Sequence, residues 1–129
     1  MAEFNLQGVS PVSFIAGGTI VANRLVELSA ANTVTATNAE GDVALGVALI
    51  GGSTGDLIPV QQFGKAKITA SDAISVGAQV EPTASGDGKC VTAAGAAARS
   101  IGVALTASGA DGDIIEVQLM LSANGPANS

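Results

Sequence analysis

The chain of 129 residues has no histidine, no tryptophan and no tyrosine, and its single cysteine is Cys90. Histidine is the side chain that most often serves as the general base beside a serine or cysteine nucleophile. A single cysteine cannot form an intrachain disulfide, which is typical of proteins assembled in a reducing compartment. These absences argue against a hydrolase with a conventional nucleophile and base, and against a disulfide-stabilised secreted scaffold.

Basic residues are few, with five Lys and Arg against eleven Asp and Glu, and the formal net charge is −6. Only Lys65 and Lys67 have a spacing that would place two cations on one face of a strand. A duplex-binding protein needs several cations on one face to neutralise phosphates. We therefore expect no nucleic-acid partner, and we expect Lys65 and Lys67 either to face solvent or to contact the carboxylates of a partner.

Long apolar runs are also missing, so no segment is predicted to cross a membrane as a helix. Residues 1–5 lack the basic start and apolar core of a signal peptide. We expect a soluble protein that is made in the cytoplasm without export and has no membrane partner.

Three Phe are the only aromatic residues, and there are 17 Gly, so the core must consist mainly of Val, Ile, Leu and Ala. Such a monomer is expected to be only moderately stable, and association with its own copies or with a larger surface would compensate. We expect Phe14 and Phe63 to lie in the core. Phe4 lies in a terminal segment with little to bury it, so we expect it to make an intermolecular contact.

Short segments rich in β-branched residues alternate with Gly, Asn, Ser and Asp, which predicts an all-β chain. Residues 43–50 alternate without a charge on either face, so we expect a strand that is covered on both faces. A return strand over residues 56–63 would complete a hairpin.

This hairpin occurs twice. Residues 45–49 match residues 101–105 at an offset of 56, and residues 55–61 match residues 112–118 at an offset of 57. Fainter matches pair residues 34–36 with 91–93 and residues 15–21 with 74–80. Two copies are too few for a solenoid. The repeat therefore predicts two related halves in one compact β-sandwich or β-barrel.

The predicted organisation is a single β domain over residues 14–121, with halves at about 14–63 and 73–121. Residues 1–13 read as an extended N-terminal arm that carries Phe4, Leu6 and Val9. Residues 122–129 read as a flexible polar tail.

Three motifs have a chemical interpretation and a simpler structural one. Residues 51–55 satisfy G-x-S-x-G, but without histidine and between two strands they are better explained as a turn. An acidic group could hold a structural cation, although Asp-Gly is also the expected chemistry of a hairpin turn; its members are Asp87, Asp111, Asp113 and Glu116. Lys89 beside a turn loosely matches the acceptor lysine of lipoyl or biotinyl domains, but its flanking residues do not. We expect no catalytic residue, no cofactor and no metal.

Residues 41–48, 74–80 and 100–104 resemble a family of phage capsid cement, or decoration, proteins, long described as conserved phage proteins of unknown function with an old recombinase label. The resemblance covers residues 14–121. It implies a non-catalytic β module on the outer capsid surface of the virion. There the module would bridge neighbouring major capsid proteins and associate as a dimer or trimer.

A small β-sandwich also suits a carbohydrate-binding or adhesion module, although the absence of Trp and Tyr removes the usual platform for stacking sugars. Our expected contact residues, for capsid or for other copies, are Phe4, Leu6, Val9, Lys65 and Lys67.

Overall fold

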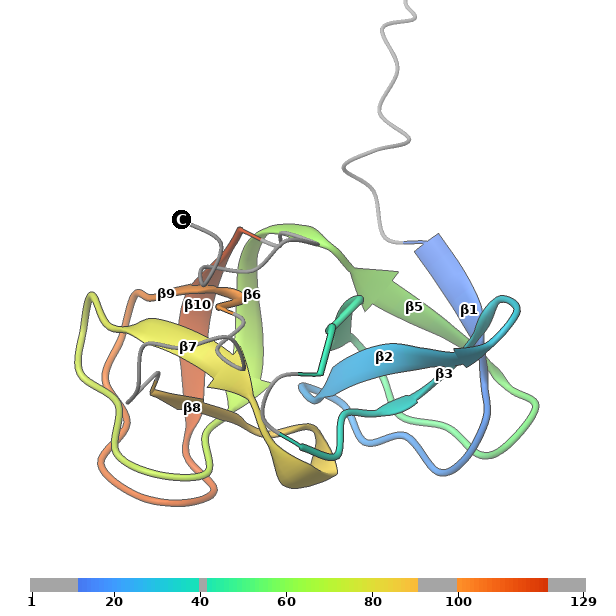
Figure 1. Cartoon of the computed structure of the whole chain (residues 1–129), viewed down its shortest axis with the longest axis horizontal. Coiled ribbons are helices and arrows are strands. Elements are labelled where there is room, and N and C mark those ends of the chain that lie inside the picture. The colour runs from blue at the N-terminus through green and yellow to red at the C-terminus, as the bar shows by residue number, and fades with distance from the viewer. Residues whose placement is uncertain (1–11, 40–41, 91–99, 121–129) are drawn as a thin grey trace, which may run out of the picture.

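The computed structural model describes residues 12–39, 42–90 and 100–120, without the side chains of residues 89 and 90. Within these residues the chain is all-β, as predicted, with one short 3-10 helix, η1 (Ala84–Gly86), and no α-helix. Two five-stranded units lie side by side (Figure 1). No helix in the described part of the chain is long and apolar enough to cross a membrane.

The first unit is a closed barrel with the strand order β1-β3-β2-β4-β5, and β5 pairs back onto β1. Its strands are β1 (Val12–Ala16), β2 (Leu25–Ala30), β3 (Thr33–Ala36), β4 (Gly46–Ala48) and β5 (Leu57–Gln61). The parallel pairing of β1 with β3 closes the barrel, and the other pairs are antiparallel.

The second unit is a five-stranded sheet with the order β6-β10-β9-β7-β8. Its strands are β6 (Phe63–Thr69), β7 (Gln79–Pro82), β8 (Gly88–Cys90), β9 (Gly102–Ala104) and β10 (Ile114–Met120). Its outer strands, β6 and β8, meet through a single parallel bridge between Ala70 and Gly88. This bridge corresponds to the fuller β1–β3 pairing of the first unit.

The two units share one strand order and one hairpin register. Val47 pairs with Gln61 in the first unit, and Val103 pairs with Gln118 in the second. These are the positions that the sequence repeat aligns, so the structure contains two related halves as predicted. The second half includes β6, because β6 pairs with β10 along its full length.

The fainter match of residues 15–21 with 74–80 is wrong. Ile20 and Ile74 are the equivalent residues, because each forms an antiparallel bridge to its own hairpin loop, with Gly52 and Ser108 respectively. The true offset there is 54 residues rather than 59.

The cores of the two units are connected. The barrel encloses one apolar cluster: Ala16, Ile20, Val26, Val34, Ala48, Ile58 and Val60. Three buried residues of the first unit, Leu25, Ala44 and Val47, instead join the cluster of the second. The amide of Thr69 in β6 also donates to the carbonyl of Asn23 at 2.9 Å. The first unit therefore packs against the second sheet beside the edge of β6 that does not pair with β10.

Two predictions about individual side chains are wrong. Phe63 is 53% exposed rather than in the core, because it shares the outward face of β6 with Lys65 and Lys67. The strand expected over residues 43–50 is regular only in β4, and Val43 and Ile50 are more than half exposed. Phe14 does pack against the core of the first unit.

Candidate interaction surface

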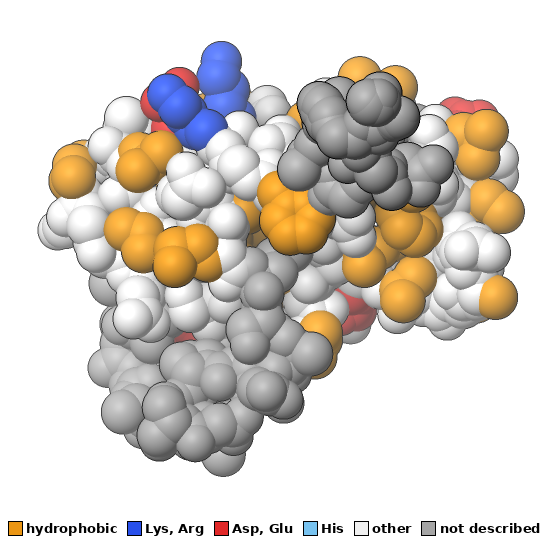
Figure 2. Space-filling model, turned by 90° about the horizontal axis from the view of Figure 1, so that it is seen from above, with side chains coloured by type: hydrophobic (Ala, Val, Ile, Leu, Met, Phe, Trp, Pro, Cys, Tyr) orange, Lys and Arg blue, Asp and Glu red, His pale blue; other side chains and the backbone are white. Residues whose placement is uncertain are grey.

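The outward face of the β6–β10 pair carries both lysines that the sequence singled out. Lys65 and Lys67 alternate with the buried residues Ala66 and Ile68, so both ammonium groups project from the same face. The Lys65 Nζ atom lies 3.6 Å from Oε1 of Glu116, whose register partner is Lys67. Basic side chains gather at one edge of the view in Figure 2, beside acidic ones. The ion pair between Lys65 and Glu116 is exposed to solvent, so it contributes little to the stability of the fold.

Apolar side chains flank these lysines. Phe63 is directly opposite Met120 in the β6–β10 register, and the two are 53% and 61% exposed. In the first unit, the register partners Ile15 and Leu57 are also exposed, at 41% and 66%. Exposed apolar side chains are spread over much of the face shown in Figure 2. Apolar surface beside charged groups is typical of protein-binding faces.

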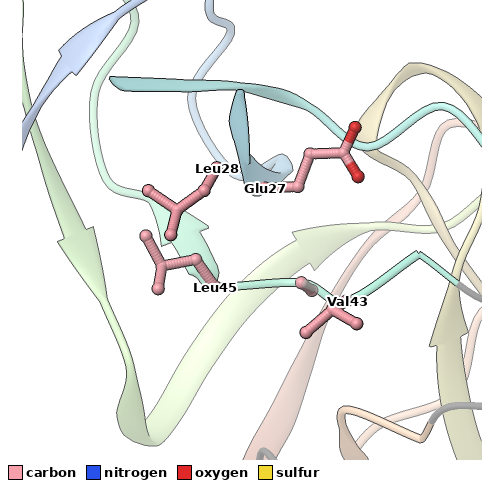
Figure 3. Close-up of a pocket in the computed structure, with 5 residues that line it drawn as sticks. Glu27, Leu28, Val43 and Leu45 are labelled. Carbon is pink, nitrogen blue, oxygen red and sulfur yellow. The ribbon is translucent and has the colours of Figure 1, made fainter. Parts of the chain in front are cut away.

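A pocket of about 260 Å³ opens where β4 leaves β2. The carbonyl of Val26 accepts a hydrogen bond from the amide of Leu45 at 2.7 Å. Beyond this bond the chain before β4 diverges from β2. The pocket is lined by Glu27, Leu28, Val43, Ala44 and Leu45. Leu28 and Leu45 point toward one another across it, and the Glu27 carboxyl lies to one side (Figure 3).

Two carboxyl groups interact beside this pocket. The pKa of Glu27 is raised to about 7 by partial burial first, and then by a hydrogen bond to Asp42 and by the charge of Asp42. Burial also acts to raise the pKa of Asp42, but hydrogen bonds from the Asn38 amide, the Glu27 carboxyl and the Ala39 amide together lower it. Below about pH 7 the pair therefore retains one proton, which Glu27 holds.

The acidic residues considered for a cation site belong to separate arrangements. Oδ2 of Asp113 accepts the amides of Gly109 and Ala110 at 2.9 and 3.2 Å, which is the role of a turn-closing aspartate. Asp87 contacts the guanidinium of Arg24. Among the described residues no three His, Cys, Asp or Glu side chains are grouped to hold a metal ion.

The G-x-S-x-G loop connects β4 to β5, which are two strands, as expected for a turn. The amide of Ser53 donates to Oδ2 of Asp56 at 2.8 Å, so this aspartate closes the loop as Asp113 does in the second unit. The structural interpretation of this motif accounts for the observed contacts.

Three of the predicted contact residues belong to the N-terminal segment. Phe4, Leu6 and Val9 lie outside the described residues, as do the side chains of Lys89 and Cys90 and the tail at 122–129. Sequence analysis did not predict the pocket. Its lining comes from two segments that are distant in sequence, Glu27 and Leu28 in β2 and residues 43–45 before β4, and only the fold brings them together. The one local signal was a glutamate within a short apolar strand.

No family model matches the chain, and no curated protein matches it in sequence. Among solved structures, its fold is similar to that of the N base of head fiber gp8.5 from bacteriophage phi29, with a TM-score of 0.68. The similarity covers 85% of this chain and 92% of that chain, at 17% sequence identity. The two chains therefore share the fold of both β units.

Proposed function

We propose that this protein is a non-catalytic structural component of a phage virion, located on the outer surface of the head. It binds neighbouring major capsid proteins and bridges them, which stabilises the shell. The observation that carries this proposal is the shared fold with the base of a head fiber over 85% of the chain. The family resemblance of residues 14–121 points to the same setting.

The chemistry of the surface supports binding rather than catalysis. The β6–β10 face combines Lys65 and Lys67 with the exposed apolar pair Phe63 and Met120. A modest contact of this kind becomes strong when many linked copies make it on one shell. The net charge of −6 keeps the unbound protein soluble at high local concentration. The expected partners are the major capsid protein and other copies of the chain, as a dimer or trimer.

The alternative is a carbohydrate-binding module. It would use exposed aromatic rings, and Phe63 is the described aromatic side chain that is more than half exposed. A single Phe without Trp or Tyr offers a poor platform for a sugar. Glycan binding is therefore the second function to test.

The test mixes purified protein with expanded heads that lack decoration, sediments the heads and counts the bound copies. We expect saturable binding at a fixed ratio to the major capsid protein, and better survival of decorated heads on heating. The proposal is wrong if no protein sediments with the heads.

Two double variants test the β6–β10 face in the same assay. Lys65→Glu with Lys67→Glu should lower occupancy about tenfold or more, because it reverses both charges of the face. Lys65→Arg with Lys67→Arg keeps both charges and should bind nearly as well as the parent. Equal occupancy for the two double variants would exclude this face from the contact.

A further inference from the structure

The outer half of β2 is a strand edge without a partner in the described structure. β2 pairs with β4 only at Leu25 and Val26, whereas its pairing with β3 continues to Ala30. The carbonyl of Val26 points toward β4, where it accepts the Leu45 amide. Alternate residues of a strand direct their peptide groups to the same side. The peptide groups of Leu28 therefore face the open side, and its side chain is 55% exposed.

The pocket lies beside this open edge. Leu28 contributes both to the edge and to the pocket wall, where it faces Leu45 (Figure 3), and Val43 also lines the pocket. An unpaired edge offers main-chain hydrogen bonds to an added strand, and an adjacent apolar pocket selects one of its side chains. The volume of about 260 Å³ is ample for one Leu or Phe side chain. Glu27 at the side of the pocket has a raised pKa, so its charge opposes an apolar occupant only in part.

The N-terminal segment has the sequence pattern of such an added strand. Residues 3–7, Glu-Phe-Asn-Leu-Gln, alternate polar and apolar side chains, so Phe4 and Leu6 would share one face. The 11 residues before β1 can span about 36 Å when extended. This length is sufficient for a contact beyond the barrel from which the segment starts.

The described strands beside the start of β1 are already paired with one another. The pairing of β1 with β5 begins at Val12, which lies opposite Val60. Phe63, three residues after Val60, is already paired with β10. The open edge of β2 is also remote from β1 around the barrel, because β1 lies between β3 and β5. A segment whose acceptor lies across the barrel from its own attachment point is suited to reach another molecule.

We propose that residues 3–7 of one copy add as a strand to the open edge of β2 in a second copy, with Phe4 or Leu6 in the pocket formed by Leu28, Val43 and Leu45. The inference concerns contacts between copies and goes beyond the proposed function. It requires no capsid. Each copy donates one segment and accepts one, so the same contact can close a dimer or a small ring.

Disulfide trapping in the full-length chain tests this arrangement directly. Cys90→Ser removes the native thiol, and two single-cysteine proteins are then made, one with Phe4→Cys and one with Leu28→Cys. When the two are mixed and oxidised, we expect a disulfide-linked heterodimer to form. The matched control replaces Leu28→Cys by Val76→Cys, which is 65% exposed in the loop before β7 of the second unit, and it should give at least about tenfold less product.

Each outcome is decisive. Equal crosslinking of Leu28→Cys and Val76→Cys overturns the proposal. A variant that carries both Phe4→Cys and Leu28→Cys provides a second check. If it forms an intrachain disulfide while the mixed single variants form no crosslink, the segment binds its own barrel and the proposal is wrong. Binding of the segment only to capsid protein would likewise leave the mixed sample uncrosslinked.

Sedimentation of the protein without heads gives an independent measure. Phe4→Ser with Leu6→Ser should weaken self-association by about tenfold or more, because it removes the apolar side chains that enter the pocket. Leu28→Ser should weaken it comparably, whereas Val76→Ser, in the loop before β7, should leave it unchanged. Unchanged self-association in the arm variant excludes the contact, whether or not the protein binds heads.

Discussion

The guanidinium of Arg24 in the first unit contacts the carboxylate of Asp87 in the second, and its Nη1 also donates to the carbonyl of Ser85 at 3.1 Å. Both side chains are largely buried, with exposures of 26% and 13%. Burial raises the pKa of Asp87, the charge of Arg24 opposes that rise, and Asp111 adds to it. The ion pair therefore holds a carboxylate that would otherwise be poorly solvated at the joint between the units.

We predict that Arg24→Ala costs about 1–3 kcal/mol in free energy of unfolding, because it leaves Asp87 buried without its cation. Asp87→Asn should cost less, since it removes the charge that needs the partner. Urea denaturation of the parent and both variants at neutral pH provides the comparison. A larger loss for Asp87→Asn than for Arg24→Ala would contradict this account.

Gly46 and Gly102 occupy equivalent positions against equivalent carbonyl groups. A Cβ atom on Gly46 would lie 2.3 Å from the carbonyl oxygen of Gln61, and one on Gly102 would lie 1.9 Å from that of Gln118. Gly46→Ala and Gly102→Ala should each destabilise the protein by about 1–3 kcal/mol or more, because the backbone must shift. Thermal unfolding measures the loss.

Gly18→Ala is the matched control for these two glycines. No heavy atom lies within 4 Å of a Cβ built at Gly18, so its unfolding temperature should stay close to that of the parent. If all three alanine variants unfold alike, the close approach of the hairpin strands is not what requires glycine.

Glu27 should make stability depend on pH near neutrality. Its pKa rises from 4.5 to about 7 on folding, so between these values the folded state binds the proton that the unfolded state has released. Raising the pH through this window therefore lowers the free energy of unfolding. Glu27→Gln should flatten the profile between about pH 5 and pH 7. The absence of histidine removes the residue that usually titrates there.

Denaturant midpoints measured across that range check this prediction. Asp87 also has a raised pKa and remains in the Glu27→Gln variant, so Asp87→Asn in the same series separates its contribution. A parent protein whose stability rises from pH 5 to pH 7 would be inconsistent with the Glu27–Asp42 pair.

Asp113 tests whether its turn has a structural or a cation-binding role. Asp113→Ala should cost about 1–3 kcal/mol, because the amides of Gly109 and Ala110 lose their acceptor. The loss should be the same in calcium and in EDTA. If calcium stabilises the parent and not the variant, the cation interpretation of this acidic group is correct.

Local patterns in the sequence were sufficient for the all-β class and the repeated hairpin. Strand alternation and turn chemistry are properties of neighbouring residues, and the repeat aligns the positions that the structure pairs as Val47–Gln61 and Val103–Gln118. The same pattern placed Lys65 and Lys67 on one strand face, which the structure confirms. It could not place Phe63, whose burial depends on which face of β6 meets the core.

Tertiary structure alone decided how the two halves differ. Both have the same strand order, yet the first closes through β1 and β3 whereas the second is covered by Leu25, Ala44 and Val47 of its neighbour. The pocket and the open edge of β2 arise in the same way, because they depend on where segments distant in sequence separate. Alternation fixes which side chains share a face, but long-range packing determines what that face meets.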